Sequence, residues 1–85
     1  MKNIPEFRRA FGDVLRHHRE MKGLTQPELA ERIEGSEINI RTLERGASAP
    51  AMVTFMLLAE ALDMDPRDML GEVMARIVFL RERDG

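Results

Sequence analysis

The sequence predicts an all-α fold, with five helices followed by a short apolar C-terminal extension. Its 85 residues are 44% apolar and 33% charged, an ordinary composition for one helical domain with a modest core. Helix-start signals recur at Thr25, at Ser36 and at Asp65-Pro66, and apolar residues recur at helical spacing between them. We therefore expect helices over residues 5–22, 26–33, 37–45 and 51–62, and a fifth from residue 66 to about residue 71. The predicted core consists of Phe7, Phe11, Leu15, Leu24, Leu29, Ile33, Ile40, Leu43, Phe55, Leu58, Leu62, Met69 and Leu70.

The first of two short central helices begins at a capping box. Thr25 and Glu28 have the T-x-x-E spacing in which each side chain accepts a hydrogen bond from the backbone amide of the other residue. Pro27 lies in the first turn, where its missing N–H costs little. Ala30 is small enough to lie where two steeply crossing helices come closest. The segment therefore predicts a helix that crosses a close neighbour.

The second short helix follows a turn at residues 34–35. Ser36 is placed to cap it, and Ile40 and Leu43 have the spacing of its inward-facing residues. Helical geometry then leaves Ile38 as an exposed apolar residue near the start of the helix. Two such helices joined by a tight turn form a helix-turn-helix, in which the start of the second helix enters the DNA major groove.

From roughly residue 12 to residue 70, the chain resembles the helix-turn-helix family of the lambda repressor and Cro, also called the XRE type. Gly12-x-x-Leu15-Arg16-x-x-Arg19, followed by Gly23-Leu24-Thr25-Gln26, is similar to the first helix of that family and the entry to its second. Leu43-Glu44-Arg45-Gly46 is similar to the end of its recognition helix. The resemblance continues through Pro50, Thr54, Leu58, Ala59, Ala61 and Leu62, and from Asp65-Pro66 to Leu70.

The resemblance implies a DNA-binding site of eight residues and one structural ion pair. It places Ser36, Glu37, Ile38 and Thr42 at base edges, with Arg41 beside them at a base or a phosphate. It places Thr25, Gln26 and Arg45 at backbone phosphates. The implied ion pair joins Arg19 to Glu44, is buried, and fixes the first helix to the end of the third.

Two departures from the family pattern affect this assignment. Glu34 stands where the family usually has the turn glycine, which here comes one residue later at Gly35. A non-glycine residue at positive φ costs roughly 1 kcal/mol, so the turn either keeps that strain or shifts by one residue and rotates the recognition helix. Glu37 and Ile38 either read a cytosine amino group and a thymine methyl, or form a solvated helix start.

The charge distribution is unusual for a DNA-binding chain. The net charge is −2, whereas affinity for DNA comes largely from neutralised phosphates. Residues 1–22 nevertheless hold six Lys or Arg against three acids, while residues 47–85 hold four against seven. We therefore expect modest affinity per subunit and a strong dependence on dimerisation. The basic residues expected to flank the groove contacts are Lys2, Arg8, Arg9, Arg16 and Lys22.

The C-terminal segment is expected to form a dimerisation element. Val53 and Leu57 make the fourth helix apolar on a side where the family pattern is usually polar, and the segment 73–80 is apolar as well. Its spacing favours a sixth helix, although Ile77-Val78-Phe79 favours a strand. This segment covers the fourth helix from the same chain or from a partner across a two-fold axis. We place residues 1–70 in the DNA-binding domain, residues 71–85 in the extension, and the dimer interface at Val53, Leu57, Val73, Ile77 and Leu80.

No catalytic, metal or membrane-spanning pattern stands out, so we expect no enzyme activity, no cofactor and no metal. The sequence has no cysteine, and no apolar run approaches the roughly 20 residues that span a bilayer. His17 and His18 are adjacent, so they point about 100° apart on a helix and do not share a metal in the i, i+4 manner. His18 is expected to be a hydrogen-bonded histidine at the core boundary. The N-terminus lacks a signal-peptide core, which predicts a cytoplasmic protein.

We therefore predict a sequence-specific transcriptional regulator, a dimeric repressor that binds a palindromic operator on double-stranded DNA. Two alternatives keep the same fold. One is the antitoxin of a toxin-antitoxin pair, which would use a second surface to bind a protein partner. The other is a protein-interaction module that no longer binds DNA.

Overall fold

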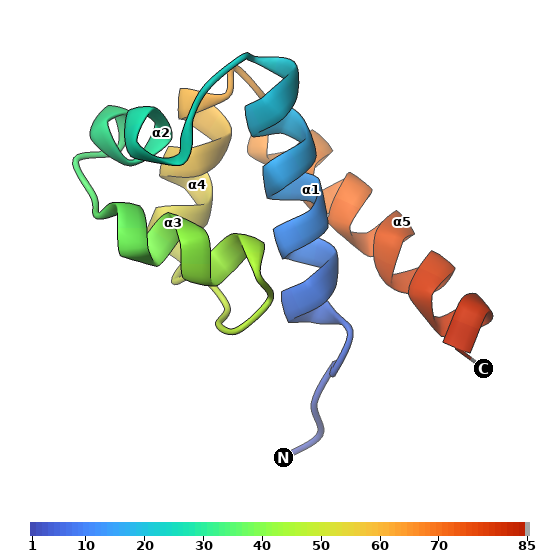
Figure 1. Ribbon diagram of the computed structural model, residues 1–85. Helices are drawn as coiled ribbons and strands as arrows, with labels where there is room; N and C mark the ends of the chain where they lie inside the picture. The colour runs from blue at the N-terminus through green and yellow to red at the C-terminus, as the bar shows by residue number, and fades with distance from the viewer. Residues whose placement is uncertain (85) are drawn as a thin grey trace.

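The computed structural model describes residues 1–84, which form five α-helices and no strand (Figure 1). The helices are α1 (Phe7–Met21), α2 (Gln26–Arg32), α3 (Glu37–Glu44), α4 (Met52–Ala61) and α5 (Pro66–Asp84). The predicted all-α class is confirmed. None of these five helices combines the length and the apolar character that a membrane-spanning helix needs.

Helix α1 lies at the centre of the arrangement, between α3 on one side and α5 on the other (Figure 1). Helices α2 and α3 pack against each other, and α4 contacts both α2 and α5. One core joins all five helices, and its members within residues 1–84 are all hydrophobic residues. Its members are Ala10, Phe11, Val14, Leu15, Leu29, Ala30, Ile40, Leu43, Phe55, Leu58, Ala59, Leu62, Met69, Val73, Ile77 and Leu80.

Both predicted N-caps are present at the starts of α2 and α3. The backbone N–H of Glu28 donates to Thr25 Oγ1 at 3.2 Å, and the N–H of Thr25 donates to Glu28 Oε1 at 2.9 Å. The N–H of Asn39 donates to Ser36 Oγ at 3.1 Å. These bonds satisfy amides that have no partner inside the helices, and they fix where each short helix begins.

The turn between α2 and α3 keeps the unshifted register, because Glu34 itself adopts the left-handed conformation at φ 52°. The N–H of Gly35 donates to the carbonyl of Ala30 at 2.8 Å, and the N–H of Glu34 donates to that of Glu31 at 3.1 Å. These two bonds form a Schellman motif. The motif offsets a strain of roughly 1 kcal/mol at Glu34. The shift by one residue considered from the sequence does not occur.

The C-terminal segment is helical, as its spacing predicted, but it is not a separate sixth helix. Helix α5 runs without a break from Pro66 to Asp84, so the proposed boundary between residues 70 and 71 lies inside it. Gly71 lies inside this helix in open space, with nothing within 4 Å of where a Cβ would lie. The strand alternative for residues 77–79 is wrong.

The continuous helix also corrects two sets of side-chain positions. Val73, Ile77 and Leu80 were expected at a dimer interface, but they are buried in the core of their own chain. Together with Met69 they form the inner stripe of α5, because they repeat every three or four residues. Leu70 was expected in the core, but it is exposed because it lies about 100° around the helix from Met69.

Gly12 allows the closest approach between α1 and α3. A Cβ at this position would lie 2.6 Å from the carbonyl oxygen of Leu43 and 2.7 Å from that of Glu44. Real Cβ atoms do not approach backbone oxygens so closely, so any larger residue must push the two helices apart. The position of α3 therefore depends on the absence of a side chain in α1.

We expect Gly12→Ala to lower the free energy of unfolding by about 1–3 kcal/mol, because the added methyl group meets backbone that cannot move aside cheaply. Urea denaturation monitored by circular dichroism measures the change. Gly71→Ala is the matched control. It should raise stability by about 0.5–1 kcal/mol, since it adds helix propensity in open space. Equal stabilisation by both substitutions would contradict the close contact.

Candidate nucleic-acid interface

Helix α3 presents an exposed side next to the start of α2. Ile38 is 71% exposed, although it is a large apolar residue, and Glu37 and Arg41 are exposed beside it. Ile40 and Leu43 hold the opposite side of α3 in the core. The outer side of α3 is therefore supported from behind and open in front, as a helix that enters a groove requires.

Two hydrogen bonds organise the outer side of α3. Arg41 Nη2 donates to Glu37 Oε1 at 3.0 Å, one turn earlier in the same helix. Thr42 Oγ1 donates to the carbonyl oxygen of Ile38 at 2.8 Å. The Thr42 hydroxyl hydrogen is thus used within the helix, which leaves its methyl group for apolar contacts. Arg41 keeps guanidinium N–H groups of the kind that pair with guanine or phosphate.

The structure contains the ion pair between Arg19 and Glu44 that the family resemblance implies. Arg19 Nε donates to Glu44 Oε2 at 2.5 Å, and Arg19 Nη2 donates to Glu44 Oε1 at 2.9 Å. The side chains are only 12% and 4% exposed. The hydrogen bonds with Glu44 raise the pKa of Arg19 above its ordinary value. Arg19 therefore keeps its positive charge, and its two hydrogen bonds to Glu44 fix the end of α3 to α1.

Glu44 also connects the ion pair to the start of α2. Gln26 Nε2 donates to Glu44 Oε1 at 3.1 Å, and Arg19 Nη1 donates to the carbonyl oxygen of Leu24 at 2.7 Å. One carboxylate thus joins α1, α2 and α3. Gln26 and Arg45, two of the predicted phosphate contacts, line a common hollow with Arg41 at this junction. Thr25, the third, is exposed at the N-cap of α2.

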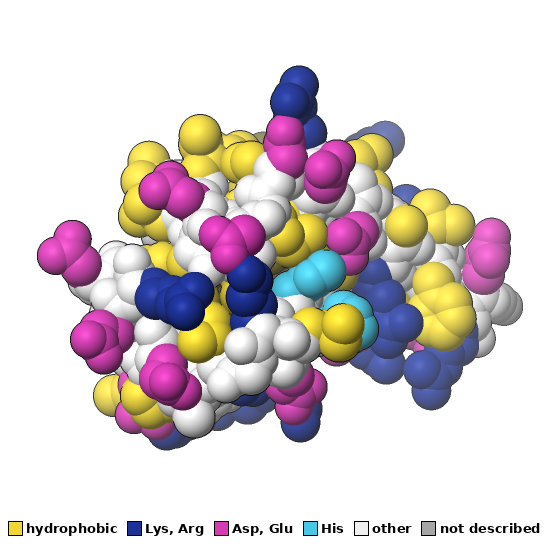
Figure 2. All heavy atoms as spheres, turned by 90° about the horizontal axis from the view of Figure 1, so that it is seen from above, with side chains coloured by type: hydrophobic (Ala, Val, Ile, Leu, Met, Phe, Trp, Pro, Cys, Tyr) yellow, Lys and Arg dark blue, Asp and Glu magenta, His cyan; other side chains and the backbone are white. Residues whose placement is uncertain are grey.

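The upper face of the molecule carries many acidic side chains. Figure 2 views the molecule from above and shows these carboxylates (magenta) spread around the two histidines (cyan). His18 Nε2 lies 2.7 Å from Glu72 Oε1 and so connects α1 to α5. Within residues 1–84, no cluster of three or more histidine or acidic side chains is arranged to hold a metal ion.

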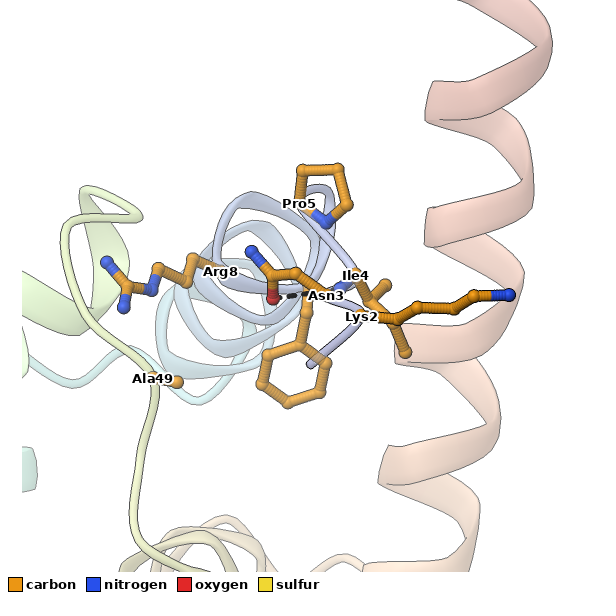
Figure 3. A pocket seen from close by; sticks show the side chains of 7 residues that line it. Lys2, Asn3, Ile4, Pro5, Arg8 and Ala49 are labelled. Atoms are coloured by element: carbon orange, nitrogen blue, oxygen red, sulfur yellow. Dashed lines mark hydrogen bonds between the residues drawn. The ribbon is translucent and has the colours of Figure 1, made fainter.

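The basic residues near the N-terminus point in different directions. Figure 3 shows Arg8 pointing toward the loop that contains Ala49, whereas Lys2 extends toward α5. Arg8 Nη1 donates to the carbonyl oxygen of Ala47 at 3.3 Å, in the loop that follows α3. Arg9 lies 3.8 Å from Asp84 of α5, and Lys22 pairs with Asp63. Only part of the basic surplus predicted to flank the groove therefore lies beside α3.

Exposed apolar side chains cover parts of α4 and α5. Val53 and Leu57, predicted at a dimer interface, are 68% and 41% exposed. Sequence reasoning missed Met74 and Val78, which are exposed on the outer side of α5. Their helical phase relative to Val73 and Ile77 would have identified them, had residues 71–84 been taken as a continuation of the fifth helix.

The comparisons with known proteins agree on one family. The helix-turn-helix domain family matches residues 10–72. An uncharacterized HTH-type transcriptional regulator of Methanothermobacter thermautotrophicus is 33% identical over 72 residues, which are 85% of this chain and 93% of the relative.

Two solved structures share the fold. The clp gene regulator ClgR from Corynebacterium glutamicum superimposes with a TM-score of 0.86 at 29% identity, over 92% of this chain and 83% of that chain. The restriction-modification controller protein C.AhdI from Aeromonas hydrophila gives a TM-score of 0.70 at 35% identity, over 73% of this chain and 94% of that chain. Both likenesses extend over most of the five helices.

We expect Arg19→Met to lower the free energy of unfolding by about 3–5 kcal/mol, because it leaves the buried carboxylate of Glu44 without its cation. Chemical denaturation measures this loss. The double variant Arg19→Met, Glu44→Leu should be more stable than Arg19→Met alone, since it removes the unpaired charge. A double variant whose loss equals or exceeds the sum of the two single losses would show that the two residues are not coupled.

Proposed function

The chain belongs to the helix-turn-helix domain family of DNA-binding transcriptional regulators, and from this premise we propose that it is a dimeric repressor of a palindromic operator. The observation that carries the proposal is the outer side of α3, where Ile38 remains 71% exposed while Ile40 and Leu43 are fully packed. A small domain gains nothing in stability from such an exposed residue. On a groove-reading helix, such a residue can pack against a thymine methyl group.

In this proposal, the side chains of α3 divide the reading of the operator. Arg41 donates to the acceptor edge of a guanine, while Ile38 and the Thr42 methyl group pack against thymine methyl groups. The Thr42–Ile38 hydrogen bond supports this role for the methyl group, because it already uses the hydroxyl hydrogen. Ser36 and Glu37 lie at the end of α3 that enters the groove first.

The start of α2 and the end of α3 supply the backbone contacts. Thr25, Gln26 and Arg45 bind phosphates on either side of the groove and so fix the register of α3 on the duplex. Glu44 supports this arrangement, since its contacts to Arg19 and Gln26 hold the two helix ends at one distance from each other. A repressor of this kind excludes polymerase by occupying the promoter.

A second copy of the chain completes the binding site. One α3 reads only a few base pairs, and a two-fold dimer places two of these helices about one DNA turn apart. The exposed apolar side chains of α4 and α5 supply a surface for such a contact, centred on Val53 and Leu57 and extended by Met74. Met52 of α4 and Leu70 of α5 line one hollow of about 130 Å³, so exposed apolar side chains of the two helices meet there.

The operator proposal is tested by selecting bound sequences from random duplexes and then measuring affinity. We expect Arg41→Ala with Thr42→Ala to weaken specific binding by about 30-fold or more, because two good base contacts of about 1–3 kcal/mol each are lost. Fluorescence anisotropy measures the affinity, and circular dichroism checks that the fold is retained. Unchanged affinity would refute the groove assignment. Failure to select any duplex would favour the protein-interaction module.

The dimer proposal is tested by sedimentation equilibrium. Leu57→Glu should convert the dimer to a monomer, because it places a charge inside the proposed apolar contact. Met21→Glu is the matched control: it makes the same kind of change at an exposed residue at the end of α1 and should leave the dimer intact. A dimer that persists in Leu57→Glu would place the interface elsewhere, and a monomeric wild-type protein would contradict the proposal directly.

A further inference from the structure

Arginine side chains gather around a hollow where α1, α2 and α3 meet. The hollow has a volume of about 300 Å³, and we call it the basic notch. Four of its six lining residues are arginines, although the whole chain carries a net charge of −2. The lining residues are Arg16, Arg19, Gln26, Arg41, Glu44 and Arg45.

The helical repeat explains why Arg16 belongs to this group. Gly12, Arg16 and Arg19 follow one another along one side of α1 at steps of four and three residues. Because Gly12 lies against the last carbonyls of α3 and Arg19 pairs with Glu44, Arg16 between them must also lie beside the end of α3. Arg41 of α3 and Arg45, the residue that caps the end of α3, are four residues apart and line the same notch.

Only part of this positive charge is neutralised inside the protein. Arg19 donates to Glu44 and to the carbonyl of Leu24, so its hydrogen-bonding capacity and the charge of Glu44 are both largely used. Within residues 1–84, Arg16 and Arg41 pair only with residues of their own helices, Glu20 at 3.6 Å and Glu37 at 3.0 Å.

These two helical pairs leave Arg16 and Arg41 available to a ligand. Their side chains remain 64% and 54% exposed, and exposed pairs at this spacing stabilise a helix only slightly. An anion in the notch therefore competes with weak partners, whereas the buried Arg19–Glu44 pair stays in place beneath it.

We propose that the basic notch binds a phosphate group and that Arg16 is a phosphate-binding residue. This inference rests on the proposed function, in which the phosphate belongs to the DNA backbone beside the groove that α3 enters. A guanidinium group donates two parallel N–H bonds to phosphate oxygens, and Arg16 and Arg45 approach the notch from different helices. Gln26 Nε2 carries a second N–H besides the one that it donates to Glu44.

The notch also accounts for DNA binding by an acidic chain. A phosphate contact depends on the local electrostatic field rather than on the net charge of the chain. The notch brings four arginine side chains together at the junction that positions α3. Arg16 adds a contact from α1 to those of α2 and α3. The backbone phosphate is then held from three helices, and Gly12 sets the distance between two of them.

The test measures the affinity for a selected duplex and for a random duplex at salt concentrations between about 50 and 200 mM. Arg16→Gln should weaken both complexes by a similar factor, on the order of 3-fold to 10-fold, and should reduce the slope of log affinity against log salt by about 1. Arg83→Gln removes the same charge from the exposed end of α5, across α1 from α3, and should change neither the slope nor the affinity appreciably (Figure 1).

A second measurement distinguishes backbone phosphate from free phosphate. Inorganic phosphate is titrated into the DNA-free protein while the Nε–H signal of Arg16 is followed by NMR. A slope reduced by Arg16→Gln, without saturation by free phosphate, supports the DNA backbone as the source. Saturation by free phosphate with an unchanged slope assigns the notch to a soluble phosphate and overturns the DNA contact. No change in either measurement, in a wild-type protein that binds its duplex, overturns the inference and leaves the proposed function standing. A wild-type protein that binds no duplex refutes the proposed function instead.

Discussion

The contact between α1 and the end of α3 is the constraint on which the rest of the structure depends. Gly12 brings the two helices close enough for backbone carbonyls to meet the bare Cα of α1. Seven residues later, Arg19 reaches Glu44 with two hydrogen bonds and extends a third to Leu24. Steric fit and a buried charge pair act on the same pair of helices. The orientation of α3 is thus fixed at the end away from the groove.

Most of the fold was predictable because its signals are local. The T-x-x-E capping box, the Ser36 cap and the Asp65-Pro66 start each depend on a few neighbouring residues, and the structure contains all three helix starts. The conformation of Glu34 was not predictable in the same way. The backbone strain at Glu34 is offset by two hydrogen bonds, from the N–H of Gly35 to Ala30 and from the N–H of Glu34 to Glu31. These bonds join the turn to the end of α2, so a residue-by-residue propensity does not reveal them. Local propensity alone favoured a glycine there.

The C-terminal part shows where sequence reasoning failed and why. The sequence predicts an apolar segment after a complete five-helix unit and places it in a dimer interface, whereas Val73, Ile77 and Leu80 pack into their own core. The error came from the boundary at Gly71, since the apolar phase of Met69 continues through it without a break. Of the eight DNA-contacting residues expected, the structure places Gln26, Arg41 and Arg45 around one notch. Arg16, expected from the sequence only to flank the groove contacts, lines the same notch, and its helical phase relative to Gly12 explains why.

The separation of roles within α3 has a consequence for how such a protein changes over time. Ile40, Leu43 and Glu44 hold the helix, while Glu37, Ile38 and Arg41 face outward and remain exposed. The outward residues can therefore be exchanged with little loss of folding free energy. The DNA sequence that such a protein prefers can therefore change during evolution at little cost in folding free energy, while the packing of the five helices stays the same.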